Sequence, residues 1–205
     1  MTGKKLIIYS ASLSLLLIVS GFLYSHYSQK IKQPVKKQHP RGIVVGNPKA
    51  PLLVQEYVNF LCPACAQFAL RVMPNLEVDY LVTGKIKMEF FLYPPFETAE
   101  AGACANEQGK FMPFHDYFFK HQQEFKDKND LGKFAAAAGL DKASFLDCLN
   151  SKKYESLAQE WLADGQTKGV DGTPTFFIGD EKSAVPGSFD YSIFKDLIEK
   201  KLNGS

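Results

Sequence analysis

Residues 52–65 read Leu-Leu-Val-Gln-Glu-Tyr-Val-Asn-Phe-Leu-Cys-Pro-Ala-Cys. Their first half, 52–58, is short, mostly apolar and partly β-branched, which predicts a buried β-strand. A turn follows, and Pro63 stands where the first position of a helix tolerates a missing N–H. Beyond it apolar residues recur at helical spacing, with Pro74 predicting a kink and Gly84 an end. The stretch therefore predicts a strand, a turn and a helix, with two cysteines at the turn.

These cysteines, Cys62 and Cys65, are separated by two residues. At a helix N-terminus, unpaired N–H groups and the helix dipole would stabilise the Cys62 thiolate and lower its pKa. Cys65 would lie one turn deeper, at a spacing that suits a small disulfide ring. The alternative is half of a zinc site, but structural zinc needs four ligands and the sequence offers no second Cys-x-x-Cys or His-x-x-x-His pair. The pattern favours a redox pair, and we expect neither a metal nor a cofactor.

The rest of the chain predicts one α/β domain over 42–205. Helical patterns fill residues 97–168, a block longer than any ordinary connection between strands. Further strands and a closing helix are expected at Ile86–Leu92, Thr175–Ile178, 183–185 and Tyr191–Leu202. The order is strand–helix–strand, a helical insertion at 97–168, then strand–strand–helix. Hydrophobic residues make up 45% and charged residues 22%, an ordinary globular composition.

The N-terminal region carries a membrane signature. Residues 6–24 contain no charge, and a helix of that length rises about 28 Å, close to the roughly 30 Å of bilayer hydrocarbon. A cleaved signal peptide is the alternative, but its apolar region is usually shorter, and the stretch after Val19 is a poor cleavage site. We expect a short cytoplasmic N-terminus at 1–5, a transmembrane anchor at 6–24 and a basic linker at 25–41.

Charge is unevenly placed along the chain. Residues 1–41 contain seven Lys and Arg and no acidic residue, whereas 42–205 has more acidic than basic residues. Nucleic-acid binding would need a basic patch on the folded part, so this function class is excluded.

Three motifs resemble the DsbA-like branch of the thioredoxin superfamily. Residues 56–65 are similar to its active-site strand and helix start. Residues 46–51, Gly-Asn-Pro-Lys-Ala-Pro, resemble the lead-in of its membrane-anchored members, and 169–176 resemble its cis-proline segment. The resemblance runs over 43–202 and implies a thioredoxin-like fold with an α-helical insertion, here preceded by an N-terminal transmembrane helix. Ala64 stands where the type member has histidine, which leaves the oxidising strength open.

The resemblance also implies roles outside the cysteine pair. The Thr173–Pro174 bond is expected to be cis, with the exposed backbone of Thr173 available to a substrate strand. Glu56 is expected to be a buried acid beneath the disulfide that exchanges a proton with Cys65. The alternative for Glu56 is an edge-strand glutamate that faces solvent.

Cys104 and Cys148 lie within the expected insertion. Some anchored and actinobacterial relatives carry a structural disulfide between the corresponding helices, and an extracytoplasmic location favours such a pair. Closing a loop of about 44 residues would stabilise the fold by about 4 kcal/mol in the chain-entropy model. Two free core cysteines are the alternative.

The resemblance implies an extracytoplasmic thiol–disulfide oxidoreductase that forms disulfides in secreted or exported proteins through Cys62 and Cys65. Its partners would be unfolded or exported proteins that contain cysteines, and a membrane quinone reductase of the DsbB or vitamin-K-epoxide-reductase type. We expect a monomer in the cell membrane, single-pass, with the catalytic domain on the extracytoplasmic side. Two alternatives stay open: a disulfide reductase or isomerase of the same fold, and a non-catalytic binding or chaperone module.

Overall fold

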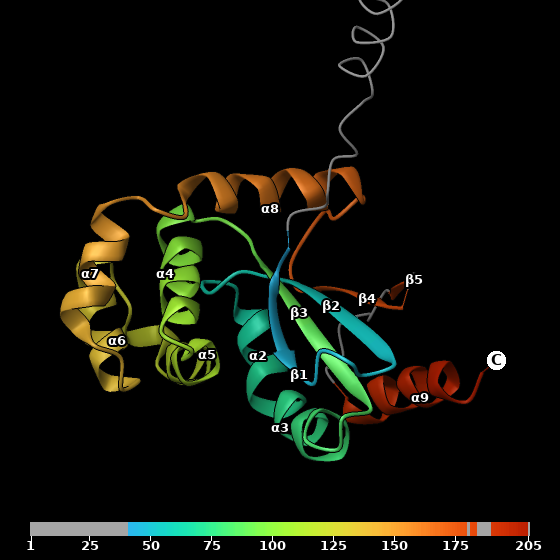
Figure 1. Cartoon of the computed structure of the whole chain (residues 1–205). Helices are drawn as coiled ribbons and strands as arrows, with labels where there is room; N and C mark the ends of the chain where they lie inside the picture. The colour runs from blue at the N-terminus through green and yellow to red at the C-terminus, as the bar shows by residue number, and fades with distance from the viewer. Residues whose placement is uncertain (1–40, 180, 184–189, 205) are drawn as a thin grey trace, which may run out of the picture. The chain divides into compact units, whose positions relative to one another are not determined.

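The structure is a computed structural model that describes residues 41–179, 181–183 and 190–204. A five-stranded sheet lies at its centre, in the order β1-β3-β2-β4-β5 (Figure 1). The strands are β1 (Ile43–Gly46), β2 (Leu52–Val58), β3 (Ile86–Leu92), β4 (Thr175–Ile178) and β5 (Glu181–Ser183). β2 and β3 are parallel, and the other neighbouring pairs are antiparallel. The chain therefore leaves β2 and β3 at the same edge of the sheet, which is where the cysteine pair follows β2.

One face of the sheet carries Glu56. It pairs with Phe90 on one side and with Phe176 on the other, and paired residues of neighbouring strands point to the same face. This face is covered by α2 (Pro63–Arg71) and α9 (Tyr191–Leu202). An aromatic ring from each helix packs on Phe176, with ring centroids 4.5 and 4.9 Å apart. Glu56 is thereby enclosed between the sheet and apolar helices.

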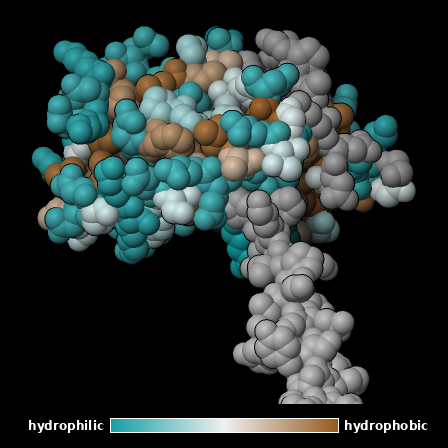
Figure 2. Space-filling model, turned by 90° about the horizontal axis from the view of Figure 1, so that it is seen from above, coloured by the Kyte–Doolittle hydropathy of each residue, from teal (hydrophilic) through white to brown (hydrophobic). Residues whose placement is uncertain are grey.

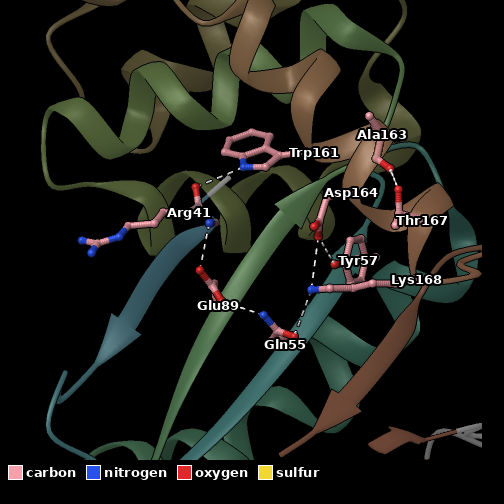
Figure 3. Close-up of polar contacts among 10 residues, drawn as sticks. Arg41, Gln55, Tyr57, Glu89, Trp161, Ala163, Asp164, Thr167 and Lys168 are labelled. Atoms are coloured by element: carbon pink, nitrogen blue, oxygen red, sulfur yellow. Dashed lines mark hydrogen bonds and ion pairs between the residues drawn. The ribbon is translucent and has the colours of Figure 1, made fainter. Parts of the chain in front are cut away.

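The opposite face is covered by α8 (Glu155–Thr167), which a buried polar network fastens to the sheet (Figure 3). Tyr57 donates a hydrogen bond of 2.5 Å to Asp164 Oδ2, and Lys168 Nζ lies 3.2 Å from the same oxygen. Lys168 also donates to Gln55 Oε1 at 3.4 Å. Because the buried carboxylate of Asp164 has both a hydroxyl and an ammonium partner, the cost of removing its charge from water is offset.

The helical block of residues 96–167 lies beside the sheet (Figure 1). Its other helices and short 3₁₀ turns are α4 (Phe96–Glu107), α5 (Phe111–Lys120), η2 (Gln122–Glu124), η3 (Lys128–Asp130), α6 (Leu131–Ala137) and α7 (Lys142–Asn150). The interior of the block is aromatic, with Phe114, Phe118, Phe134 and Phe145 all buried. The structure bonds Cys104 of α4 to Cys148 of α7 as a disulfide.

The helix after the cysteines is interrupted, as Pro74 predicts. α2 ends at Arg71, and the chain continues as α3 (Met73–Leu76) and a π-helical turn, η1 (Glu77–Leu81). Proline has no N–H to donate to the preceding turn, so the helical hydrogen bonding cannot run straight through. The π-helical turn was not predicted from the sequence.

β1 was not predicted, because four residues are too short a run for alternation to show. Within the helical block, α5 ends at Lys120 and η2 follows. The chain turns tighter there, where His121 N donates to carbonyls of the last helical turn.

Several expectations lie outside the described residues. These are the anchor at 6–24, the linker before Arg41 and residues 184–185 of the partner strand. The division into 1–5, 6–24, 25–41 and 42–205 stays a prediction. In the part of the chain that the structure describes, no helix has the length and apolar character needed to cross a membrane.

Candidate active site

The cysteine pair stands at the start of α2. Cys62 is the residue that precedes the helix, in an extended conformation, and Pro63 takes the first helical position. The turn before it is held by Asn59, whose side chain accepts from Leu61 N at 2.7 Å and whose carbonyl accepts from Cys62 N at 3.0 Å. Asparagine favours such turns because its side chain can replace a backbone acceptor. The local sequence thus places the Cys62 thiol at a helix N-terminus.

The surroundings of Cys62 favour its ionised form. A hydrogen bond from the Cys65 thiol contributes most, and the Thr173 side chain and the backbone N–H groups of Cys65 and Ala64 add to it. Partial burial acts in the opposite direction. Together these interactions lower the pKa of Cys62 to about 5, so the thiol is a thiolate at neutral pH.

Cys65 and Glu56 lie beneath, in the core. Burial, the hydrogen bond to Cys62 and the nearby Glu56 carboxyl raise the pKa of Cys65 well above its ordinary value. Glu56 is 1% exposed, and burial raises its pKa well above the ordinary value for a carboxyl. Within the described residues, neither of its carboxyl oxygens has a hydrogen-bond partner. Because β2 is a central strand, the solvent-facing alternative for Glu56 is wrong. Proton exchange with Cys65 stays a prediction that this placement supports.

The cis-proline segment meets the cysteine pair. The Thr173–Pro174 bond is cis, and the Thr173 carbonyl lies 3.1 Å from Cys62 Sγ, where it accepts a hydrogen bond from the protonated thiol. Both residues are partly exposed and directly precede β4. The two segments are more than a hundred residues apart in sequence, and the pairing of β2 with β4 brings them together. A second cis bond, Pro94–Pro95, follows β3 and was not predicted.

One residue that contacts the active-site turn was not predicted from the sequence. Gln122 Nε2 donates to Phe60 O at 2.7 Å and to Cys62 O at 3.0 Å. Phe60 is buried, and its ring packs against Phe114, His115, Phe118 and Phe119 of α5. The aromatic spacing of α5 indicated a packed helix, but no local signal connected Gln122 to a turn 60 residues earlier.

Cys104 and Cys148 are not part of this group. Their disulfide joins two helices of the block, where Cys104 is 1% exposed and Cys148 is partly exposed. Across the described residues, no three side chains of His, Cys, Asp or Glu come together as a metal site requires.

Three features define a thioredoxin-like thiol–disulfide oxidoreductase: a low-pKa cysteine at a helix N-terminus, a second buried cysteine one turn on, and a cis-proline bond whose Thr173 carbonyl contacts the first sulfur. Comparison with known proteins agrees. The sequence profile of the family described as Thioredoxin matches residues 38–200. The chain is 27% identical over 184 residues to "Disulfide bond formation protein D" of Bacillus subtilis (strain 168), covering 84% of this chain and 81% of that one.

Solved structures agree with the sequence comparison. The crystal structure of Wolbachia pipientis α-DsbA1 has a TM-score of 0.69 and 26% identity, covering 80% of this chain and 92% of that one. Oxidised BdbD from Bacillus subtilis has a TM-score of 0.67 and 24% identity, covering 80% and 94%. The chain belongs to the thioredoxin family, in its DsbA-like branch of protein thiol–disulfide oxidoreductases.

Proposed function

We propose that this chain is an oxidant that donates the Cys62–Cys65 disulfide to cysteine pairs of unfolded, exported proteins. The observation that carries the proposal is the pKa of Cys62, lowered to about 5. A stabilised thiolate favours the reduced form of the enzyme over its disulfide, and a protein whose reduced form is favoured gives its disulfide away readily. A reductase would need the opposite balance.

The proposed reaction proceeds by two exchanges. A substrate thiolate attacks Cys62 Sγ, and the Cys62–Cys65 bond breaks as the new S–S bond forms. Cys65 leaves as a thiolate and takes a proton, for which the buried carboxyl of Glu56 is the nearby source. A second substrate thiolate then attacks the substrate sulfur and releases the Cys62 thiolate. The substrate has lost two electrons, and the enzyme pair has gained them.

The surface around the thiol suits an unfolded chain. Leu61 directly precedes Cys62 and is 37% exposed. The partly exposed Thr173 segment precedes a strand and can pair with an extended substrate backbone. Apolar side chains and an open main-chain segment recognise no particular sequence, as a general oxidant requires. On the face drawn in Figure 2, hydrophobic residues form small groups between hydrophilic ones.

We further propose that the domain works outside the cytoplasm, anchored by residues 6–24. The length and flanking charges of that segment support an anchor, and disulfide formation persists only in oxidising compartments. The reduced pair would then be reoxidised by a membrane quinone reductase of the DsbB or vitamin-K-epoxide-reductase type, which the anchor keeps close.

Oxidative folding tests the direction of the reaction. Oxidised enzyme is mixed with reduced, unfolded ribonuclease A, and free thiols and recovered ribonuclease activity are followed. The proposal expects two substrate thiols to be lost for each enzyme disulfide consumed. Rapid reduction of insulin together with no oxidation of ribonuclease would indicate a reductase instead.

Labelling of intact cells tests the location. A membrane-impermeant maleimide should modify reduced Cys62 without lysis. Labelling that appears only after lysis would place the domain in the cytoplasm.

A further inference from the structure

Gln122 reaches the active-site turn from the helical block. It begins η2, just after α5 ends, and its side chain is partly buried. Its amide nitrogen donates to both Phe60 O and Cys62 O, at 2.7 and 3.0 Å. One amide group thus holds the carbonyl of the redox cysteine together with a carbonyl two residues before it.

We propose that Gln122 is a positioning residue that holds Cys62 in the conformation that stabilises its thiolate. The inference rests on the proposed exchange reaction, because it assigns Gln122 a part in the same site. It gives the insertion a mechanical role in addition to covering the sheet: α5 and η2 carry the amide that holds the turn.

The Gln122 amide restrains the orientation of the peptide that contains the Cys62 carbonyl. The Cys62 carbonyl accepts the first hydrogen bond of α2, from Ala66 N at 3.1 Å. The backbone N–H groups of Ala64 and Cys65, which stabilise the thiolate, belong to that same first turn. Rotation of the Cys62 peptide would move the sulfur away from these donors. A second bond to its carbonyl opposes that rotation.

The amide also acts electrostatically. The carbonyl oxygens of Phe60 and Cys62 belong to the turn that carries the Cys62 sulfur, and their partial negative charge disfavours a thiolate. The amide hydrogens of Gln122 face these oxygens and offset that charge. Loss of the Gln122 amide should therefore raise the Cys62 pKa through both the change in orientation and the change in electrostatics.

Buried aromatic contacts fix the helical block against the active-site turn, so that Gln122 can restrain it. The Phe60 ring lies 4.7 Å from Phe118 and 5.3 Å from Phe119, centroid to centroid. Because the turn and α5 share this buried contact, η2 is held at a fixed distance from Cys62. His121 and Glu124 flank Gln122 in sequence, and their side chains pair with each other at 2.8 Å. They are present in every variant proposed below.

Two substitutions at this position test the inference. Gln122→Met keeps the length of the side chain and removes the donors, and Gln122→Glu also adds a negative charge. Gln123→Met and Gln123→Glu are the matched controls, because Gln123 is the exposed next residue of η2. The titration of Cys62 in the reduced full-length protein is followed by thiolate absorbance at 240 nm, together with thermal unfolding and the rate at which the reduced protein opens a disulfide-bonded peptide.

We expect the titration midpoint to rise by about half a pH unit in Gln122→Met and by about one unit in Gln122→Glu. At a pH below the midpoint, the exchange rate should fall about threefold and about tenfold, in proportion to the thiolate that is lost. Both controls should keep the wild-type midpoint. This pattern would not follow from a merely structural role, which moves the unfolding temperature and leaves the midpoint in place.

Unchanged midpoints in both folded Gln122 variants would overturn the inference. So would failure of both to fold while the Gln123 controls fold, because the amide would then hold the fold rather than the thiol. Wild-type enzyme that titrates near pH 5 but oxidises no substrate would contradict the proposed function alone, since the midpoints are read independently of turnover.

Discussion

The low pKa of Cys62 makes the stability of the reduced protein depend on pH. An unfolded cysteine has a pKa of about 8.5, whereas Cys62 in the fold has a pKa of about 5. Because folding lowers the pKa, the ionised thiol contributes stability that is complete above the unfolded pKa and is lost as pH falls through the folded pKa. At pH 7, two units above the folded pKa, this contribution reaches up to about 2.7 kcal/mol. Cys62 is partly exposed, so solvent screening leaves roughly half of it.

The assay compares reduced and oxidised protein by urea unfolding at several pH values between 7 and 4. The stability of the reduced form, relative to the oxidised form, should fall by about 1–1.5 kcal/mol over this range, a shift in Tm of about 2–6 °C for a domain of this size. Glu56 titrates in the opposite sense: its raised pKa gives stability that is present below the unfolded pKa and lost as pH rises. Glu56 titrates in this way in both the reduced and the oxidised form, so its contribution largely cancels in the difference between their free energies of unfolding.

The disulfide does not titrate, so it adds a constant offset to the difference in stability between the two forms. The pH dependence of that difference therefore comes from the Cys62 thiol of the reduced form. Cys62→Ala protein is the control: it lacks the thiol, so its stability should show no pH dependence from Cys62. A difference between reduced and oxidised wild type that stays flat from pH 7 to pH 4 would refute the assignment of a low pKa to Cys62.

Three further predictions concern named side chains. Cys62→Ser should abolish turnover, whereas Cys65→Ser should accumulate mixed disulfides at Cys62; faster alkylation of Cys65 than of Cys62 at neutral pH would reverse these roles. Alanine at both Cys104 and Cys148 should lower the free energy of unfolding by at most about 4 kcal/mol for the 44-residue separation, with exchange retained at low temperature. Thiol counting on denatured, unreduced protein checks the bond, and two free thiols at these positions would disprove it. Glu56→Gln should slow formation of the mixed disulfide, the step in which Cys65 leaves, about 100-fold while raising stability at neutral pH; an unchanged rate would remove Glu56 from proton transfer.

Local patterns were sufficient for the parts of the fold that depend on near neighbours. The apolar run of β2, Pro63 at the helix start and the break caused by Pro74 follow from adjacent residues, and the structure has all three. β1 pairs with β3 at a separation of more than 40 residues, and its four residues carry no pattern of their own. Its strand conformation follows from that pairing rather than from local preference.

The site shows the same division. The positions of Cys62 and Cys65 follow from a single turn, and resemblance supplied the cis bond before Pro174. That the Glu56 carboxyl has no hydrogen-bond partner among the described residues depends on which side chains the neighbouring strands place beside it, which one sequence does not reveal. Gln122 could not have been found, because a polar residue in a surface turn gives no sign that it will meet a backbone carbonyl 60 positions away.

The reduction potential of the Cys62–Cys65 pair tests the proposed direction of exchange most directly. Full-length protein is equilibrated with glutathione buffers of graded redox ratio, and the fraction of reduced pair is measured by thiol alkylation. A thiolate with a pKa of about 5 stabilises the reduced form, and we predict a potential closer to about −120 mV, the value of a strong disulfide donor, than to about −270 mV. A potential near about −270 mV, the value of a disulfide reductant, would contradict it.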